Sequence, residues 1–262
     1  MLKDRFRYFL GILMVIPVFP LMYFQARKLK KDFPDLPEAK NPGGKTAGEP
    51  GLSLLMLGES SIAGVGVEDH QDAISGKLTS ELSGLSQKSI NWQVVAKSGY
   101  TARQVREELV NKIPDEKFDL IVIGLGGNDT FKLNSPWYWK KSMRRLVLAL
   151  HKKHPEASIV ITYMPPVHTF IAFSPLIRFF LGNLTKLLGR EMKRLAPDYD
   201  YLYYFDYVVS WEDWIIHSDA RNPADFFSDG VHPSALTYHL WGEDTARFIY
   251  ESVLLEKDQL VS

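Results

Sequence analysis

From Leu52 onward, short apolar runs alternate with longer stretches in which apolar residues recur every three to four positions. The short runs are continuous rather than alternating, which is typical of strands buried on both faces of a parallel sheet. They predict five strands, over residues 52–57, 92–96, 120–125, 158–164 and 201–205. The intervening patterns predict helices over residues 73–85, 102–113, 137–154, 175–195 and 234–254. Strands that alternate with helices indicate a doubly wound, three-layer α/β/α sandwich on a five-stranded parallel sheet.

The N-terminal pattern is different. Residues 6–24 are almost wholly apolar or aromatic, interrupted only by Arg7, Pro17 and Pro20. A helix of about 19 residues spans roughly 28 Å, enough for a bilayer core. No small-residue cleavage site follows, so residues 1–31 predict a retained membrane anchor with a basic flank. A cleaved secretory signal and a surface-lying helix kinked at the prolines are the alternatives.

The segment between this anchor and the first predicted strand, residues 32–51, is rich in proline, glycine and charge. It predicts a flexible tether to a domain over residues 52–262. Basic residues flank the apolar segment on both sides, and a margin of one charge leans towards a catalytic domain on the cytoplasmic face of a bacterial inner membrane. The membrane face and the oligomeric state stay open.

Composition narrows the function classes. The 31 Lys and Arg residues balance the 31 Asp and Glu residues, so nothing indicates a nucleic-acid partner. The absence of cysteine excludes disulfides and thiolate metal sites. His151 and His154 lie three residues apart at a predicted helix end, but no third ligand accompanies them, and no metal or cofactor is predicted.

Four polar blocks mark the ends of hydrophobic runs: Gly58–Ser61, Ser98–Tyr100, Gly126–Asp129 and Asp229–Pro233. The first three follow predicted strands directly, and in doubly wound folds ligand sites gather at the carboxyl ends of the strands. Together the blocks supply a serine, two oxyanion donors and an Asp/His pair. These are the groups that acyl transfer through a serine nucleophile requires.

The serine and the oxyanion donors could each have a structural role instead of a catalytic one. Ser60 and Ser61 compete as nucleophile, and both could merely cap a turn. Asn128 could aim its side-chain amide at an oxyanion and Gly99 could add a backbone N–H, or both could belong to ordinary turns.

Asp229 and His232 are three residues apart, which lets the carboxylate and the imidazole lie on the same side of one turn. The carboxylate would orient the imidazole while the other ring nitrogen deprotonates the serine. An Asp-Gly turn that leads into a helix starting after Pro233 is the alternative.

The four blocks, in this order, resemble those of the SGNH hydrolases, also called the GDSL esterase/lipase family. The resemblance covers residues 52–253 and aligns Ser60, Gly99, Asn128 and His232 with the serine, glycine, asparagine and histidine of the family's name. It implies a flavodoxin-like fold, no metal or cofactor, and hydrolysis of carboxylic esters by a Ser60–His232–Asp229 triad. The oxyanion hole that it implies consists of the Ser60 and Gly99 N–H groups and Asn128.

One departure from the family pattern is visible: Glu59 stands where the family usually has Asp before the nucleophile. Glu59 is the one feature that favours a catalytically silent, membrane-tethered binding module as an alternative. The apolar stretch over residues 169–188 predicts either a lipophilic lid or a core helix. With the anchor, it favours acyl-lipid or lysophospholipid-like esters over sugar acetates. Short-chain esters also belong to the predicted substrates, and an O-acetyl glycan esterase or acetyltransferase is the other alternative.

Overall fold

The computed structural model describes residues 2–32, 36–49, 51–209, 211–216 and 218–256. Its centre is a six-stranded sheet in the order β1-β3-β2-β4-β5-β6. The strands are β1 (Gly43–Lys45), β2 (Leu52–Gly58), β3 (Ile90–Ala96), β4 (Leu120–Gly124), β5 (Ser158–Ile161) and β6 (Leu202–Tyr204). Strands β2 to β6 are the five predicted strands and run parallel, which confirms the α/β class. The strand β1 pairs antiparallel with β3, so the predicted strand count was one short and the sheet is mixed.

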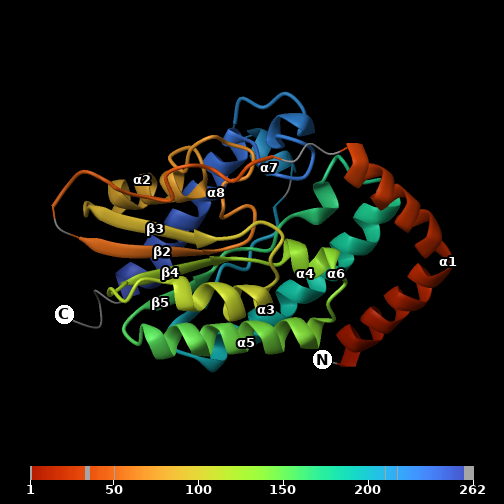
Figure 1. Ribbon diagram of the computed structural model, residues 1–262, viewed down its shortest axis with the longest axis horizontal. Coiled ribbons are helices and arrows are strands. Elements are labelled where there is room, and N and C mark those ends of the chain that lie inside the picture. The colour runs from red at the N-terminus through yellow and green to blue at the C-terminus, as the bar shows by residue number, and fades with distance from the viewer. Residues whose placement is uncertain (1, 33–35, 50, 210, 217, 257–262) are drawn as a thin grey trace.

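Helices cover both faces of the sheet (Figure 1). One face carries α2 (Ile74–Ser86) and α8 (Ala235–Ile249), which continues as a π-helical turn over Tyr250–Leu254. The other carries α3 (Ala102–Gln104), with its π and 3₁₀ continuations Val105–Leu109 and Val110–Lys112, together with α5 (Pro136–Lys153) and α6 (Pro175–Leu195). The remaining helices are α1 (Leu2–Asp32), α4 (Gly127–Phe131) and α7 (Trp211–Ile216), and short 3₁₀ turns cover Val167–Thr169, Ala196–Asp198 and Pro223–Phe226.

The central strand β2 shows why its sequence is continuously apolar. Leu55 and Leu57 point into the core beneath α5 and α6, while Leu54 and Met56 point into the core beneath α2 and α8. All four side chains are fully buried. A strand covered on both faces has no solvent side on which a polar residue is favoured, and this removes the alternation of a half-exposed strand.

The segment before β2 corrects one expectation. Residues 36–49 do not form a flexible tether, because β1 extends the sheet at the edge of β3 and further backbone hydrogen bonds fix the chain beside it. The Lys40 N–H donates to the Glu68 carbonyl at 2.9 Å, and the Glu38 carboxylate accepts the Ser98 N–H at 2.8 Å. Edge pairing uses backbone groups, which proline and glycine content does not reveal. Residues 33–35 and 50 of the predicted tether, and 257–262 of the predicted domain, lie outside the described residues.

The N-terminal apolar segment forms one continuous helix, α1, beside α6 at the edge of the domain (Figure 1). Its Lys3–Gln25 portion has a mean hydropathy of 1.7, and by length and composition it could cross a membrane. Signal sequences share these two properties.

Candidate active site

The strand order reverses at the neighbouring strands β2 and β4. From β2 the chain moves to β3 on one side and then crosses to β4 on the other. The last residues of the two strands, Gly58 and Gly124, are register partners, so the loops that follow them begin side by side. Such a switch point leaves a crevice at the carboxyl edge of the sheet. Glu59 and Ser60 enter it from β2, and Gly126 leads into α4 from β4.

The predicted Asp/His pair is joined directly. The His232 Nδ1 and Asp229 Oδ2 atoms are 2.6 Å apart, and the Asp229 side chain is fully buried while that of His232 is 24% exposed. The second carboxylate oxygen of Asp229 accepts the backbone N–H groups of Val231 and His232 at 2.9 and 2.7 Å. Asp229 therefore fixes both the turn and the ring. Burial raises the pKa of Asp229, but these hydrogen bonds outweigh it and hold the pKa below its ordinary value.

The loop after Ser60 packs against the loop that carries this pair. Gly66 has a φ of +111°, and a Cβ atom there would lie 2.4 Å from the Pro233 carbonyl oxygen, so only glycine fits. The Tyr238 hydroxyl of α8 donates to the Val65 carbonyl at 2.8 Å. Within the described part of the chain, the Ser60 hydroxyl makes no hydrogen bond to His232. Ligand-free enzymes often show such a contact long and tighten it only when substrate is bound.

The two predicted backbone donors are available. Among the described residues, no carbonyl or side-chain oxygen accepts the N–H groups of Ser60 and Gly99. Gly99 has a φ of +81°, and the space where a Cβ atom would lie is open. A side chain there would both strain the backbone and fill this space. The Asn128 amide donates one N–H to Glu59 and has a second N–H to offer.

Glu59 has a defined task in the structure. Its buried carboxylate accepts the backbone N–H groups of Gly127 and Asn128 at 2.7 and 2.8 Å, and the Asn128 side-chain amide at 2.5 Å. The residue before Ser60 thus holds the start of α4 and orients the Asn128 amide. The longer side chain that departs from the family pattern still makes a full set of hydrogen bonds here.

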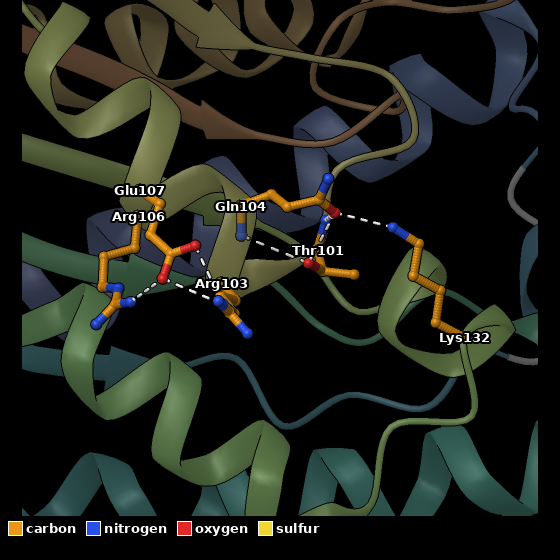
Figure 2. A network of polar contacts seen from close by, with 6 residues as sticks. All are labelled: Thr101, Arg103, Gln104, Arg106, Glu107 and Lys132. Atoms are coloured by element: carbon orange, nitrogen blue, oxygen red, sulfur yellow. Dashed lines mark hydrogen bonds and ion pairs between the residues drawn. The ribbon is translucent and has the colours of Figure 1, made fainter.

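The five-residue helix α4 and the residue that follows it contact the loop between β3 and α3, which carries Gly99. The buried Asp129 carboxylate accepts the Ala102 N–H at 2.9 Å and the Asn134 amide at 2.6 Å. Figure 2 shows Lys132, just after α4, donating to Gln104, whose side chain also accepts from Thr101. The Lys132 ammonium also lies 3.5 Å from the Gly99 carbonyl oxygen. Glu59, Asp129 and Lys132 together tie the loops that carry Ser60, Asn128 and Gly99 to one another.

Burial raises the pKa of both Glu59 and Asp129. Burial raises the pKa of Glu59 to about 7, with the nearby Asp129 charge adding to it, although the N–H groups of Gly127 and Asn128 oppose the rise. Burial also raises the pKa of Asp129, against the hydrogen bonds from Ala102 and Asn134. Both carboxyl groups are therefore harder to ionise than surface acids.

A Glu59→Gln substitution tests this protonation. The folded chain keeps the Glu59 proton between its ordinary pKa of 4.5 and about 7, whereas the unfolded chain loses it, so the free energy of unfolding falls as pH rises through that window. Glutamine does not titrate. The variant should therefore gain on the order of 2–3 kcal/mol relative to wild type between pH 4.5 and 8, measured by urea unfolding. A difference that stays constant with pH would mean that the three donors keep Glu59 ionised throughout.

The sequence missed α4 and the roles of Asp129 and Lys132. Five residues are too few for a 3.6-residue apolar period, and Gly126, Gly127 and Asn128 are ordinary turn formers. The one available signal was the acidic residue at each of two predicted strand ends, Glu59 and Asp129. The predicted apolar stretch 169–188 divides: Phe170, Ile177 and Leu181 are buried, and Ile171 and Phe179 are exposed.

The two histidines at the end of α5, His151 and His154, make packing contacts. The His151 ring stacks on Tyr201 with the centroids 3.6 Å apart, and the His154 ring meets the edge of Phe118. In the described ranges, no group of three or more His, Cys, Asp or Glu side chains is placed to hold a metal ion.

A family model described as the GDSL-like Lipase/Acylhydrolase family matches residues 56–240, from within β2 to within α8. The matched range spans the positions of Ser60, Gly99, Asn128, Asp229 and His232. The chain belongs to this family. The resemblance predicted from the four polar blocks is confirmed, and with it membership of a family of hydrolases. None of the curated proteins compared with the chain matches it in sequence.

Several solved structures share the fold. A member of the lipolytic protein G-D-S-L family from Veillonella parvula is 12% identical over 77% of this chain and 99% of that chain, with a TM-score of 0.57. Axe2, an acetyl-xylooligosaccharide esterase from Geobacillus Stearmophilus, is 17% identical over 76% and 94%, with a TM-score of 0.54. A carbohydrate esterase family 2 enzyme from Corynascus thermopiles is 17% identical over 79% and 68%, with a TM-score of 0.57. At these identities the likeness concerns the fold.

Proposed function

We propose that the chain is a serine esterase that hydrolyses carboxylic esters through an acyl-enzyme. In the first half of the reaction, the Ser60 Oγ attacks the ester carbonyl carbon while the His232 Nε2 takes the hydroxyl proton. Asp229 stabilises the imidazolium that forms. The negative carbonyl oxygen of the tetrahedral intermediate accepts hydrogen bonds from the Ser60 N–H, the Gly99 N–H and the Asn128 amide.

The intermediate then collapses. The C–O bond to the alcohol breaks, and His232 returns its proton to the departing oxygen. A water molecule repeats the sequence on the acyl-enzyme: His232 takes its proton, the hydroxide oxygen bonds to the acyl carbon, and Ser60 leaves with the proton from His232. The products are a carboxylic acid, an alcohol and the free enzyme.

The observation that carries this proposal is the 2.6 Å pair of His232 and Asp229 in a loop packed against the loop that follows Ser60. A buried carboxylate, already bonded to two backbone N–H groups, leaves its other oxygen to the ring. That arrangement fixes which ring nitrogen can act as base. The available N–H groups of Ser60 and Gly99 and the amide of Asn128 would stabilise the negative charge on the oxygen of the tetrahedral intermediate.

An apolar cluster beside His232 favours substrates with an acyl chain. Its buried members are Val167, Phe170, Ile177 and Leu181, packed with Met22, Phe173, Phe227 and Val231. Val231 lies in the turn between Asp229 and His232, so the cluster borders the catalytic loop. Ile171 is 42% exposed and packs over Gly230, where it offers an apolar wall to a ligand. We therefore propose acyl-lipid or lysophospholipid-like esters as the substrate class.

An O-acetyl glycan esterase is the second candidate. Its support is the fold that the chain shares with Axe2 and with the carbohydrate esterase family 2 enzyme. Both substrate classes occur among proteins with this fold, so a measured preference for acyl-chain length distinguishes acyl-lipid esters from O-acetyl glycans.

A series of p-nitrophenyl esters from acetate to decanoate tests the substrate class. A buried methylene contributes about 0.8 kcal/mol, so kcat/KM should rise at least about tenfold from acetate to octanoate. Ile171→Ser is the matched variant: it should lower the octanoate rate and leave the acetate rate nearly unchanged. A sharp optimum at acetate would favour the glycan ester. Failure to cleave any ester, with no labelling by a fluorophosphonate probe, would favour a catalytically silent binding module.

A further inference from the structure

The helix α1 packs against the domain along its whole apolar length. Its half-buried residues are Asp4, Tyr8, Gly11, Val15, Val18, Met22 and Gln25, and the residues between them are exposed. They recur at alternating steps of four and three residues, the spacing of a seam between two helices that lie side by side. The partner is α6, which runs beside α1 in Figure 1.

Polar contacts fix both ends of this seam. Near the start of α1, the Asp4 carboxylate pairs with Arg190 at 2.6 Å and with Arg194. Near its end, Gln25 accepts the Ser174 hydroxyl at 2.7 Å. The contacts join the start of one helix to the end of the other, so α1 and α6 run antiparallel. The two side chains at the polar ends of the seam both have partners, as docking on the domain requires.

Aromatic rings add a third contact. The Tyr8 ring meets Trp137, at the start of α5, edge-on with the centroids 4.8 Å apart, and Phe9 lies 5.9 Å from the same indole. Trp137 remains 45% exposed. Tyrosine and tryptophan are enriched where a protein meets the boundary of a bilayer.

The outer face of α1 exposes an apolar surface. Its exposed large apolar residues are Phe6, Phe9, Leu10, Ile12, Leu13, Met14, Ile16, Phe19, Leu21, Tyr23 and Phe24. A contiguous surface of this kind marks a membrane or protein contact rather than a solvated face. Ile171 and Phe179, on the loop before α6 and on α6 itself, are also exposed.

The seam is incompatible with a helix that crosses the bilayer. The portion Lys3–Gln25 spans roughly 34 Å, and α6 accompanies it from Ser174 to Arg194. If α1 stood across the membrane with this seam intact, α6 would stand in the hydrocarbon beside it. The charged residues of α6 include Arg178, Lys186, Arg190, Lys193 and Arg194. Each such charge at the bilayer centre is strongly unfavourable, so the docked helix must lie along the surface.

A basic pocket at one end of the seam complements a lipid surface. It has a volume of about 270 Å³ and is lined by the first turn of α1, residues 136–144 of α5 and Glu191 of α6. Its cationic lining is Arg5, Lys140, Lys141 and Arg144. The two acids that line it, Asp4 and Glu191, both pair with Arg194. Of the cations, Lys140 also lies 3.9 Å from Glu191, and Arg144 pairs with the exposed Asp198 at 3.2 Å. A phosphate headgroup at the depth of the helix suits this lining.

We propose that α1 is an interfacial helix: it stays docked on α6 and lies in the plane of an anionic bilayer, with its outer face in the acyl region and the basic pocket at the headgroups. Met22 of the seam and Val231 of the catalytic turn pack in the same apolar cluster, so this docking brings the Asp229–His232 loop to the membrane surface. The inference rests on the helix contacts and holds whether or not the chain is an esterase.

Depth measurements on the full chain test the proposal. The chain has no cysteine, so single substitutions give unique labelling sites. Phe6→Cys, Leu13→Cys and Phe24→Cys replace side chains that are 67, 66 and 65% exposed. Steps of 7 and 11 residues are near whole turns, which places all three on the face opposite the seam. Each variant would carry a nitrobenzoxadiazole label and bind vesicles of three parts phosphatidylcholine to one part phosphatidylglycerol that contain nitroxide quenchers at graded depths.

The expected result is one shallow depth for all three labels. A Val15→Cys variant, labelled in the seam, should be quenched at least severalfold less and serves as the matched control. Binding should weaken severalfold on pure phosphatidylcholine; equal binding there would overturn the assignment of the basic pocket to headgroups.

Two outcomes would overturn the interfacial helix itself. A Leu13 label at the bilayer centre, with the Phe6 and Phe24 labels near opposite surfaces, would show a spanning helix. Labels that stay unquenched in a chain that sediments as a dimer would show that a second copy covers the face. None of these readouts depends on ester hydrolysis, and the Ser60→Ala background should give the same depths.

Discussion

Ser60→Ala is expected to lower kcat/KM for ester hydrolysis by on the order of 10⁴-fold or more and to abolish labelling by a fluorophosphonate probe. The substitution removes the oxygen that forms the acyl-enzyme in the proposed mechanism, while the proposed oxyanion donors and the Asp229–His232 pair stay in place. The Ser60 side chain makes no hydrogen bond among the described residues, so the variant should keep the thermal stability of the wild type.

Ser61→Ala is the matched control, because the two serines are neighbours and the change of atoms is identical. It should retain most of the activity and take the probe at the wild-type rate. Labelling that survives in Ser60→Ala and disappears in Ser61→Ala would move the nucleophile by one residue. Loss of labelling in both variants, with folded protein, would point to a shared structural role of the turn.

Asp229→Asn should lower kcat by on the order of 10⁴-fold while the loop stays folded. Asparagine keeps the shape and can still accept the Val231 and His232 N–H groups with its carbonyl oxygen. Its NH₂ group would then face the His232 Nδ1 and donate to it. This forces the proton onto Nε2, the nitrogen that accepts the proton of Ser60 in the proposed mechanism. Steady-state kinetics at saturating ester measures the loss directly.

The same change has a signature in stability. The pKa of Asp229 is lower in the folded chain than its ordinary value of 3.8, so the ionised carboxylate stabilises the fold above that pH. This contribution is lost as the pH falls through the lowered pKa and is absent from the asparagine variant. Asp225→Asn, which changes an exposed acid that caps the nearby 3₁₀ turn, is the matched control for activity. The Arg221 and Asn222 N–H groups lower the pKa of Asp225 as well, so this variant should also lose stability that depends on an ionised carboxylate but keep full activity. An Asp229→Asn variant within tenfold of wild type would contradict the orienting role.

The parallel strands could be predicted because a strand that is buried on both faces appears in the sequence as a continuous run of apolar residues. The helix α6 was equally accessible: Ser174 caps it, Pro175 occupies its first turn, and its apolar period continues to Leu195. The pair of Asp229 and His232 belongs to the same class, because a spacing of three residues within one turn settles their contact. These predictions depended only on residues that are close together in the sequence.

Features that depend on distant partners were not accessible. The three donors to Glu59 come from residues 68 and 69 positions away, and Asp129 reaches an N–H group 27 positions away. The sequence marked Glu59 only as a departure from the family pattern, and its hydrogen bonds could not be inferred. Strand β1 is three residues long and glycine-rich, and its pairing with β3 leaves no apolar signature.

The ordered segment before β2 decides where the chain can be shortened. A truncated protein that begins at Leu52, where the apolar pattern starts, would lack β1 and leave the edge of β3 unpaired, which is a template for aggregation. It would also lose Glu38, whose carboxylate holds the Ser98 N–H next to Gly99. A helix-free form for crystallisation or spectroscopy should therefore start at Leu36, sixteen residues earlier than the hydrophobic pattern suggests.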